Sequence, residues 1–377
     1  MIDRLLLWPY WLALKTRNHK YRGGRHTVQA EVPTICIGNV TVGGTGKTPH
    51  TEMVVRTLID MDGPHRHIAV LSRGYKRKSK GFQQVSTDGS ASFYGDEPLQ
   101  MKVKFPDITV ALEKDRIAGC KYLCHPDFVK VLARNRKCRN KEFPRADVII
   151  LDDAMQYRRL SPTITIALVN SARPVFEDKL LPLGRLRDLP ERIYDADAII
   201  VTKCPTYTTD MDKEEWAERL GLKEFSLPDC SAVTPSGKTI HLFFTSIGYA
   251  TPVPVFPEAD RRYTYSGQAV AFSGIADDTP FLQYLSGLHQ VMGSLKFPDH
   301  HKFGRGDIAS ILSMSKKNPL ALVATTEKDA QRMRDAGNVP AYLRERMFYI
   351  PIEVSFIGDE EHSVFLNMLS GAVNSAR

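Results

Sequence analysis

A glycine-rich segment at residues 41–48, TVGGTGKT, constrains the fold of this chain more than any other feature. It follows the apolar run TICIGNV at residues 34–40 and precedes a helical pattern from Thr48 to Ile59. Glycines between a buried strand and a helix let main-chain amides approach phosphate oxygens, and the helix start adds partial positive charge. This context predicts a phosphate-binding loop at the edge of a parallel sheet.

The residues of this loop have predicted roles in holding a nucleotide with magnesium. Lys47 is expected to reach the β- and γ-phosphates, and Thr48 to bind Mg²⁺. Threonine stands at position 41, where the strict GxxxxGK[ST] pattern has its first glycine, so a chance glycine-rich turn is the alternative. The predicted nucleotide-binding residues are Thr41, Val42, Gly43, Gly44, Thr45, Gly46, Lys47 and Thr48.

Two adjacent acids end another apolar strand pattern, ADVIILDD at residues 146–153. Asp152 and Asp153 are therefore expected at the carboxyl edge of the sheet, where parallel sheets bind ligands. Together with Thr48 they form the predicted magnesium site. A helix cap or a turn is the alternative role for either acid alone.

Short apolar strand patterns alternate with helical ones along most of the chain. This alternation predicts an α/β fold, with a parallel sheet of the P-loop NTPase type between flanking helices. Turn-interrupted segments follow residue 230, and the alternation then resumes, which indicates a second, smaller α/β domain joined by a β-ribbon linker. The expected units are residues 1–28 (an N-terminal membrane-interface helix and basic segment), 29–230 (the phosphate-loop domain), 231–266 (the β-ribbon linker) and 267–377 (the smaller domain).

The N-terminus is apolar and aromatic at first and then basic. Residues 5–14 are LLLWPYWLAL, and Lys and Arg residues follow without an acid until Glu31. No apolar run reaches the roughly 18 residues that a membrane-spanning helix needs. We expect either a helix in the membrane interface with its basic run on anionic lipid, or a helix docked on the protein's own core. The net charge of +8 also favours an anionic partner.

Several classes of protein fit a phosphate loop. A GTPase needs an NKxD motif, but VTKCP at residues 201–205 lacks the aspartate and TTEKD at residues 325–329 has the wrong spacing. A partitioning-type switch ATPase carries a signature lysine where this chain has Val42. Both classes are disfavoured and stay open beside a small-molecule or lipid kinase. A nucleic-acid binder would suit the charge, but no basic and aromatic recognition motif occurs outside the N-terminus.

A series of short segments extends from residue 38 to residue 332. They are GNVTVGGTGKTP (38–49), LSRGYKRKSKG (71–81), YGDEP (94–98), ILDDAMQYRRL (150–160), LPLGRLRDLP (181–190), FSGIADDTPF (272–281), FPDHHKF (297–303) and TTEKDAQR (325–332). In this order they resemble the tetraacyldisaccharide 4'-kinase (lipid A 4'-kinase) family. The chain departs from the family at Ala154, Met155 and Tyr157, and Tyr157 stands where the family usually has histidine.

The resemblance implies a kinase that transfers the γ-phosphoryl group of ATP to the 4'-hydroxyl of a tetraacylated glucosamine disaccharide 1-phosphate in lipid A biosynthesis. It implies ATP and Mg²⁺ as cofactors, and the acylated lipid and an anionic membrane surface as partners, with no nucleic acid. The expected location is the cytoplasmic face of the bacterial inner membrane, as a peripheral protein.

The resemblance also implies site residues. It places the catalytic base at Asp96, assisted by His300 and with Lys47 on the transferring phosphoryl group. An imidazole beside a carboxylate orients it and relays a proton, and domain closure would bring the two together. A helix cap is the alternative for Asp96, and a surface position for His300. Asp299 and His301 rank below His300.

The segment at residues 181–190 resembles a family loop near the active site. Arg185 and Arg187 are therefore expected to bind the 1-phosphate of the substrate or ATP, because guanidinium groups bind phosphate with two hydrogen bonds. Asp188 matches a family glutamate and is grouped with them, as is Arg73, a family-like position in LSRGY. The alternative is a solvated basic loop.

Overall fold

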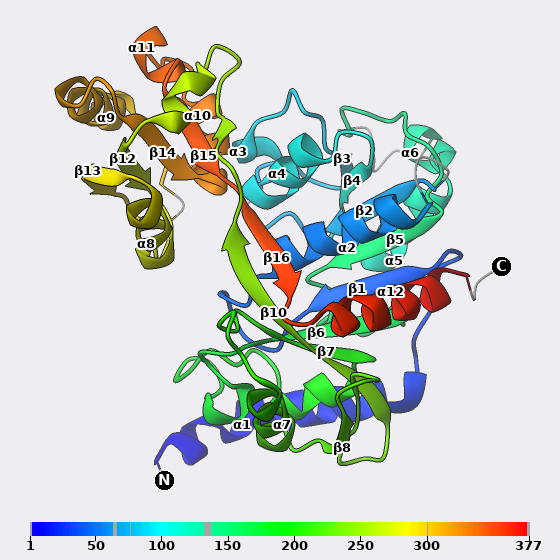
Figure 1. Cartoon of the computed structure of the whole chain (residues 1–377). Coiled ribbons are helices and arrows are strands. Elements are labelled where there is room, and N and C mark those ends of the chain that lie inside the picture. Colours follow the sequence, from blue (N-terminus) through cyan, green and yellow to red (C-terminus); the bar gives the residue numbers. More distant parts are fainter. Residues whose placement is uncertain (1, 63–65, 76, 132–136, 300, 375–377) are drawn as a thin grey trace.

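The computed structural model describes residues 2–62, 66–75, 77–131, 137–299 and 301–374. The chain forms two sheets with helices around them, one large and mostly parallel and the other smaller (Figure 1). The expected α/β class, with a P-loop-type sheet and a second smaller unit, is confirmed.

The large sheet has the strand order β3-β4-β2-β5-β1-β6-β7-β10-β9-β8. Its central strand β1 pairs in parallel with β5 on one side and β6 on the other, which places Ile37 beside Asp152. All five residues of β1 are buried, as expected for a strand covered on both faces. The strands are β1 (Thr34–Gly38), β2 (Ile68–Ser72), β3 (Gln83–Gln84), β4 (Thr109–Leu112), β5 (Val148–Asp152), β6 (Ile164–Asn170), β7 (Ala198–Thr202), β8 (Lys223–Ser226), β9 (Ser231–Val233) and β10 (Thr239–Tyr249).

The two faces of this sheet belong to separate cores, because side chains alternate along each strand. Cys36 packs on one side with Cys120 of α5 and Leu14 of α1. Ile37 packs on the other side with Val54 of α2 and with the C-terminal helix. The helices of this unit are α1 (Ile2–Lys20), α2 (Lys47–Asp62), α3 (Ala91–Tyr94), α4 (Asp96–Lys104), α5 (Arg116–Cys124), α6 (Asp127–Val131), α7 (Asp210–Arg219) and α12 (Asp359–Asn374).

The smaller sheet has the order β11-β15-β14-β12-β13, with its central strands parallel. Its strands are β11 (Val253–Pro254), β12 (Gln268–Ser273), β13 (Gln290–Lys296), β14 (Leu322–Thr326) and β15 (Met347–Ile350). Its helices are α8 (Thr279–Leu288), α9 (Arg305–Lys317), α10 (Glu327–Asp335) and α11 (Ala341–Arg344). Short 3-10 helices of the chain lie at Arg22–Gly24, Val175–Glu177, Pro190–Asp195 and Arg261–Tyr265.

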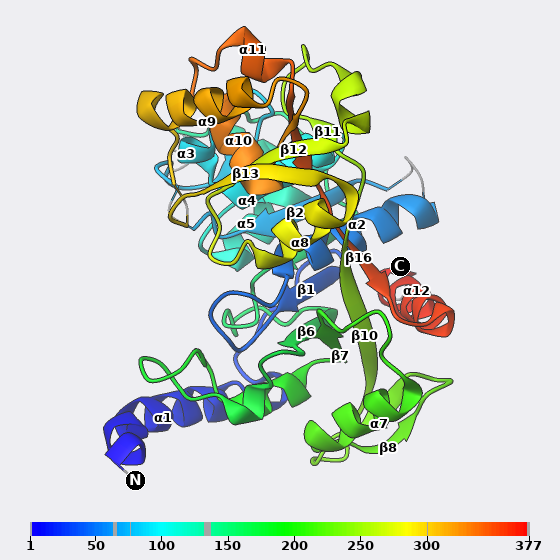
Figure 2. The same cartoon turned by 60° about the vertical axis from the view of Figure 1, so that its left-hand side comes forward.

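A two-stranded antiparallel ribbon connects the two sheets, as Figures 1 and 2 show. It pairs β10 with β16 (Ile352–Phe356), from Thr245 beside Phe356 to Tyr249 beside Ile352. The linker expected at 231–266 contains only the first of these strands. The smaller domain was expected over 267–377, but after β15 the chain returns through β16, and α12 packs on the large sheet. A local sequence pattern does not reveal a strand's partner far along the chain, which is why this return was not foreseen.

The N-terminal helix α1 lies at the end of the molecule opposite the smaller sheet (Figure 2). Leu14 is 3% exposed and belongs to a core of the large sheet, whereas Trp8 is 59% exposed and Trp11 37%. One side of the helix is therefore docked, as the second alternative predicts, and another presents aromatic rings to the surroundings. Among the described residues, we find no helix with the length and apolar character that crossing a bilayer requires.

Candidate active site

The phosphate loop connects β1 to α2 and has the backbone that its glycines predict. Gly43, Gly44 and Gly46 have φ angles of 71°, 73° and 75°, in the left-handed region that favours glycine. A Cβ atom at Gly43 or Gly44 would meet nothing within 4 Å. The conformation, and not a lack of space, therefore explains glycine at these two positions.

Neighbouring strands hold the loop by its carbonyl groups. Asn170 Nδ2, at the end of β6, donates to the carbonyl of Gly44 at 3.0 Å. Thr202 Oγ1, at the end of β7, donates to the carbonyl of Thr45 at 3.1 Å. Fixing these carbonyls toward the sheet orients the peptide groups of the loop without using their amide hydrogens, which are the phosphate donors of such loops.

A buried histidine joins the loop to the ribbon between the sheets. Burial lowers the pKa of His50 to about 4, so its ring is neutral at pH 7. Its Nδ1 lies 2.7 Å from the carbonyl oxygen of Gly46 and its Nε2 lies 2.9 Å from Thr245 Oγ1. Since a carbonyl only accepts, Nδ1 carries the proton and Nε2 accepts from the threonine.

Asn39, at the start of the loop, is a site residue that we did not single out from the sequence. It is fully buried, and its Nδ2 donates to the hydroxyls of Thr45 at 2.6 Å and Thr41 at 3.2 Å. Its Oδ1 accepts from Arg187 at 2.6 Å and lies 3.5 Å from Lys47 Nζ. Asn39 therefore aligns the lysine and an arginine from a distant segment on one amide group.

The two acids after β5 lie beside the loop in different environments. Burial, with the nearby carboxylates of Glu97 and Asp153, raises the pKa of Asp152 to about 6. Burial alone would also raise the pKa of Asp153, but the hydrogen bond from Arg187 and the positive charges of Lys47, Arg187 and Arg116 together lower that pKa. Arg187 contacts both oxygens of Asp153, one of them at 3.0 Å. Asp153 is ionised at neutral pH, while the charge on Asp152 is costly without a cation.

A cavity of about 1190 Å³ joins these residues to the smaller unit. The loop and α4 contribute to its walls, together with Phe303 and Arg332 from beyond the ribbon. The sequence-predicted residues that line it are Lys47, Thr48, Arg73, Asp96, Asp152, Asp153 and Arg187. Arg185 and Asp188 are not among the lining residues, and His300 lies outside the described residues.

Asp96 is held by an arginine of the smaller unit. It is the first residue of α4, whose N-cap is Gly95, so Asp96 does not occupy the N-cap position. Arg332 of α10 donates to one Asp96 oxygen from Nε at 3.1 Å and from Nη2 at 2.7 Å. The neighbouring Glu97 accepts from Lys328 at 2.8 Å, and this ammonium lowers the pKa of Glu97. The motif TTEKDAQR thus supplies a cation to each of the two YGDEP acids.

His301 has partners of its own, away from the acids of α4. Its Nε2 lies 2.9 Å from Asp307 Oδ2, and its ring stacks on Phe297 with centroids 5.0 Å apart. Asp307 is in the first turn of α9, so this contact fastens the FPDHHKF segment to that helix. His301 therefore has a packing role in the smaller unit.

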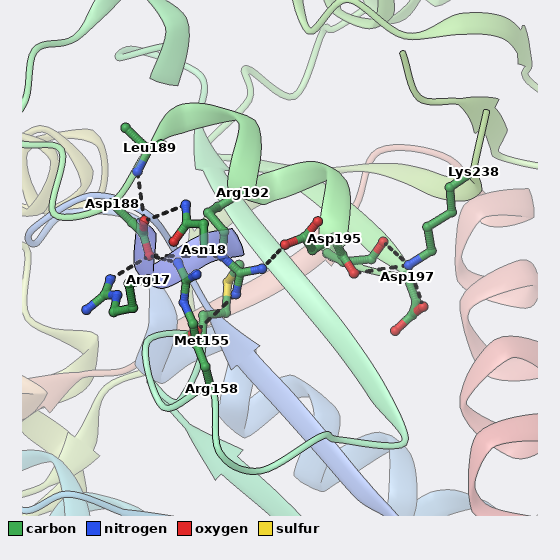
Figure 3. A network of polar contacts seen from close by, with 11 residues as sticks. Arg17, Asn18, Met155, Arg158, Asp188, Leu189, Arg192, Asp195, Asp197 and Lys238 are labelled. Carbon is green, nitrogen blue, oxygen red and sulfur yellow. Dashed lines mark hydrogen bonds and ion pairs between the residues drawn. The ribbon is translucent and has the colours of Figure 1, made fainter. Parts of the chain in front are cut away.

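Arg187 and Asp188 face opposite directions. Arg187 lines the cavity, whereas the carboxylate of Asp188 is 1% exposed and accepts from Arg158 at 2.7 Å and Arg17 at 3.0 Å (Figure 3). We do not retain the expected substrate contact for Asp188, because arginines already occupy its carboxylate. Arg185 lies outside the cavity, and its main-chain amide donates to Asp178.

Two further side chains of the cavity lie near the end of β4. Arg116 is 2% exposed and donates to the carbonyl of Asp152 at 3.0 Å, so it fixes the turn that carries the acids. An arginine after the carboxyl end of an apolar strand is the signal that we did not use. Tyr157 donates to Asp115 at 2.7 Å, so the hydroxyl that replaces the usual family histidine acts on the N-cap of α5.

The parallel sheet, the loop, its lysine and the acids on the neighbouring strand define a phosphate-loop nucleotide-binding protein. Within this class, the family model described as LpxK, tetraacyldisaccharide-1-P 4'-kinase, matches residues 4–370. The chain belongs to this tetraacyldisaccharide 4'-kinase family.

Individual relatives and a solved structure agree with this assignment. A tetraacyldisaccharide 4'-kinase of Parabacteroides distasonis is 38% identical over 89% of this chain and 84% of the relative. The enzyme of Phocaeicola vulgatus is 36% identical over 94% of this chain and 90% of the relative. The enzyme of Flavobacterium johnsoniae is 33% identical over 95% of this chain and 94% of the relative. A crystal structure of LpxK from Aquifex aeolicus in complex with ATP has a TM-score of 0.66 and 25% identity, over 98% of this chain and 99% of the other.

Proposed function

We propose that this protein transfers the γ-phosphoryl group of ATP to the 4'-hydroxyl of a tetraacylated glucosamine disaccharide 1-phosphate. The observation that carries the proposal is one cavity lined by the end of the phosphate loop, the acids after β5 and Asp96. In such a cavity a nucleotide's terminal phosphate and an acceptor hydroxyl can meet beside a carboxylate. Membership of the family supports this acceptor.

The nucleotide is held by the loop. The amides of residues 41–48 surround the phosphates, and the Lys47 ammonium compensates negative charge on the transferring group. Arg187 binds a phosphate of ATP or of the substrate, and its hydrogen bonds to Asp153 and Asn39 keep its guanidinium facing the cavity.

Thr48, Asp152 and Asp153 are the residues that would hold Mg²⁺, which supplies charge compensation to the nucleotide phosphates when bound. Hydroxyl and carboxylate oxygens are ligands that suit Mg²⁺. The crowding of Asp152 by Asp153 and Glu97, which contributes to its raised pKa, supports a cation at this position. The described residues contain no group of three or more His, Cys, Asp or Glu side chains that could hold a metal by themselves. Kinase sites use one or two carboxylates with phosphates and water.

Asp96 accepts the proton of the attacking hydroxyl in this proposal, and His300 assists it. The Arg332 fork supports this role because it fixes the direction of the carboxylate and favours its ionised form. Arg73 lines the same cavity and is proposed to contact the lipid's 1-phosphate. Arg185 lies outside the cavity, and we propose for it only a contact with a phosphate of the incoming substrate or ATP.

The acyl chains of the proposed substrate belong in a lipid bilayer, so the protein needs a surface that binds the membrane. Helix α1 has exposed apolar side chains that suit this contact. Trp8, Tyr10, Trp11 and Leu12 are exposed large apolar side chains on this helix. Aromatic rings at headgroup depth with basic residues beside them are typical of interfacial helices. We therefore propose peripheral binding at the cytoplasmic face of the bacterial inner membrane.

The test is a transfer assay with the purified full chain, γ-labelled ATP, Mg²⁺ and a tetraacylated disaccharide 1-phosphate in detergent, with the Lys47→Ala variant as background. We expect label in the lipid, lost when the 4'-hydroxyl is blocked. Label released only as inorganic phosphate would instead indicate an ATPase and would contradict the proposed transfer.

A further inference from the structure

Asp188 lies in a cluster of arginines (Figure 3). Its Oδ2 accepts from Arg158 at 2.7 Å and from Arg17 at 3.0 Å, with Arg192 Nε at 4.0 Å. Arg158 and Arg192 are largely buried, and burial lowers the pKa of both. Asp188 therefore compensates the charge of Arg158 and Arg17 in a poorly solvated space, while Arg192 also pairs with Asp195.

The residue before Asp188 belongs to the nucleotide site. The main-chain amide of Arg187 donates to the carbonyl of Val40 at 2.8 Å, which fastens this segment to the strand that enters the loop. The Arg187 side chain then contacts Asp153 and donates to Asn39 Oδ1 at 2.6 Å. Because Arg187 and Asp188 are joined by one peptide bond in an irregular loop, a shift of Asp188 moves Arg187 with it.

Helix α1 reaches this segment at two places. The Tyr10 hydroxyl donates to the carbonyl of Arg187 at 3.2 Å. Near the C-terminal end of the helix, Arg17 and Asn18 donate to the two carboxylate oxygens of Asp188, at 3.0 and 3.4 Å. Leu14, between them, is buried in the core. The position of α1 therefore sets the position of residues 187 and 188.

We propose that Asp188 is a positioning residue that couples the seating of α1 to Arg187, and through Arg187 to ATP affinity. The inference rests on the proposed function for the roles of Arg187 and α1. A protein whose helix is seated has Arg187 in place, and a protein whose helix is displaced binds ATP more weakly. Such coupling is reciprocal, so bound ATP also holds α1 more firmly.

The first test replaces the outer partner, because Arg17 is 40% exposed and its loss leaves the core intact. We expect Arg17→Met to weaken ATP binding by the full chain with Mg²⁺, measured by calorimetry, by roughly fivefold or more. Arg219→Met is the matched control, since Arg219 is 41% exposed and pairs with Glu177 of the loop that leads to Asp188. It should leave ATP affinity unchanged.

The second test is a pair of mutant cycles. We expect Asp188→Asn to weaken ATP binding as Arg17→Met does, and Asp188→Glu to restore part of it because the charge remains. In a protein that already carries Arg187→Met, adding Asp188→Asn or Arg17→Met should not weaken ATP binding further. The reason is that both substitutions act on ATP binding through Arg187. A purely structural role would lower the unfolding temperature and leave ATP affinity per folded molecule unchanged.

The coupling would be overturned if Arg17→Met binds ATP as tightly as wild type. It would also be overturned if the losses of ATP affinity in Arg17→Met and Arg187→Met add fully in the double variant. If Asp188→Asn does not fold, Arg17→Met and its cycle with Arg187→Met decide the question. The measurement needs no lipid acceptor, so it separates the two proposals. A chain that binds ATP and transfers no phosphoryl group to the lipid would contradict the proposed function, while the coupling would still be measured.

Discussion

The acids of the site differ in how their charge is compensated. Arg332 binds Asp96, and Arg187 binds Asp153, whereas Asp152 is buried beside other carboxylates and its pKa is raised to about 6. An arginine partner keeps a carboxylate ionised and fixed in direction. A buried carboxylate without an arginine partner is stabilised when a cation binds beside it. Asp96 thus has the fixed and compensated carboxylate that the proposed base needs, whereas Asp152 is the carboxylate whose charge a cation would stabilise most.

For Asp96 we expect that Asp96→Asn lowers kcat by roughly 10²–10⁴, the usual contribution of a positioned base. The KM for ATP should change little, because the loop and Lys47 are untouched. Steady-state kinetics with labelled ATP measure both constants. Asp107→Asn, at an exposed acid outside the cavity, is the control and should keep the wild-type rate. An Asp96→Asn variant that turns over as fast as this control would argue against the base.

Replacing Asp152 should raise the stability of the protein and abolish its activity. Its folded-state pKa of about 6 lies above the ordinary value of 3.8, so its charge costs stability as pH rises through about 6. We expect Asp152→Asn, without Mg²⁺ or nucleotide, to melt a few degrees higher than wild type at pH 8 and to lose kinase activity.

The gain in stability should shrink between pH 6 and pH 4, where the wild-type carboxyl takes up its proton. Thermal melts across this range measure it, with Asp107→Asn, an exposed acid, as the control. A lower melting temperature for Asp152→Asn at pH 8 would contradict a costly buried charge.

At the scale of elements, α1 has one docked side and one exposed side. Leu14 packs in a core of the large sheet and Arg17 pairs with Asp188, so a deletion of the whole helix would also open that core. Trp8 and Trp11 are exposed and contribute little to that docking. Membrane binding is therefore better tested on the exposed rings than by truncation.

We expect the double variant Trp8→Ser/Trp11→Ser to bind anionic vesicles at least several-fold more weakly, because two interfacial aromatic anchors are lost. Its unfolding temperature should stay close to that of wild type. Vesicle sedimentation measures the binding. The matched control is Met211→Ser/Leu320→Ser, which removes two exposed apolar side chains elsewhere, 79% and 72% exposed. Equal loss in both double variants would show that position on α1 is irrelevant.

At the scale of the whole molecule, a row of ion pairs joins α4 of the large unit to α10 of the small one. Beside the pairs of Asp96 and Glu97, Lys104 contacts Glu52 and lies 3.3 Å from Glu327. Burial and the nearby Glu52 carboxylate raise the pKa of Glu327 to about 7. The contact between the units thus holds two carboxylates around one ammonium, close to the cavity.

We expect Lys104→Met to destabilise the protein by about 3–5 kcal/mol, because it removes the ammonium that pairs with two buried carboxylates. The loss should be larger at pH 8.5 than at pH 6, since a carboxyl with a raised folded-state pKa loses stability as pH rises through that value. Urea unfolding at both pH values measures this. Adding Glu327→Gln should restore most of the stability at pH 8.5, and no recovery would place the defect elsewhere.

The sequence by itself determined the features that depend on neighbours along the chain. Strand, glycine turn and helix start follow each other in the phosphate loop, and Asp152 ends an apolar strand, so local patterns locate both. The family-like segments identified Asp96 as a candidate site residue, but they did not predict which side chains surround it. Only the tertiary structure decided which side chains meet: Arg332 with Asp96, β16 with β10, and Arg17 with Asp188. These contacts depend on how distant segments pack, and in an irregular loop the main-chain pairing alone decides that Arg187 faces the cavity while Asp188 faces away.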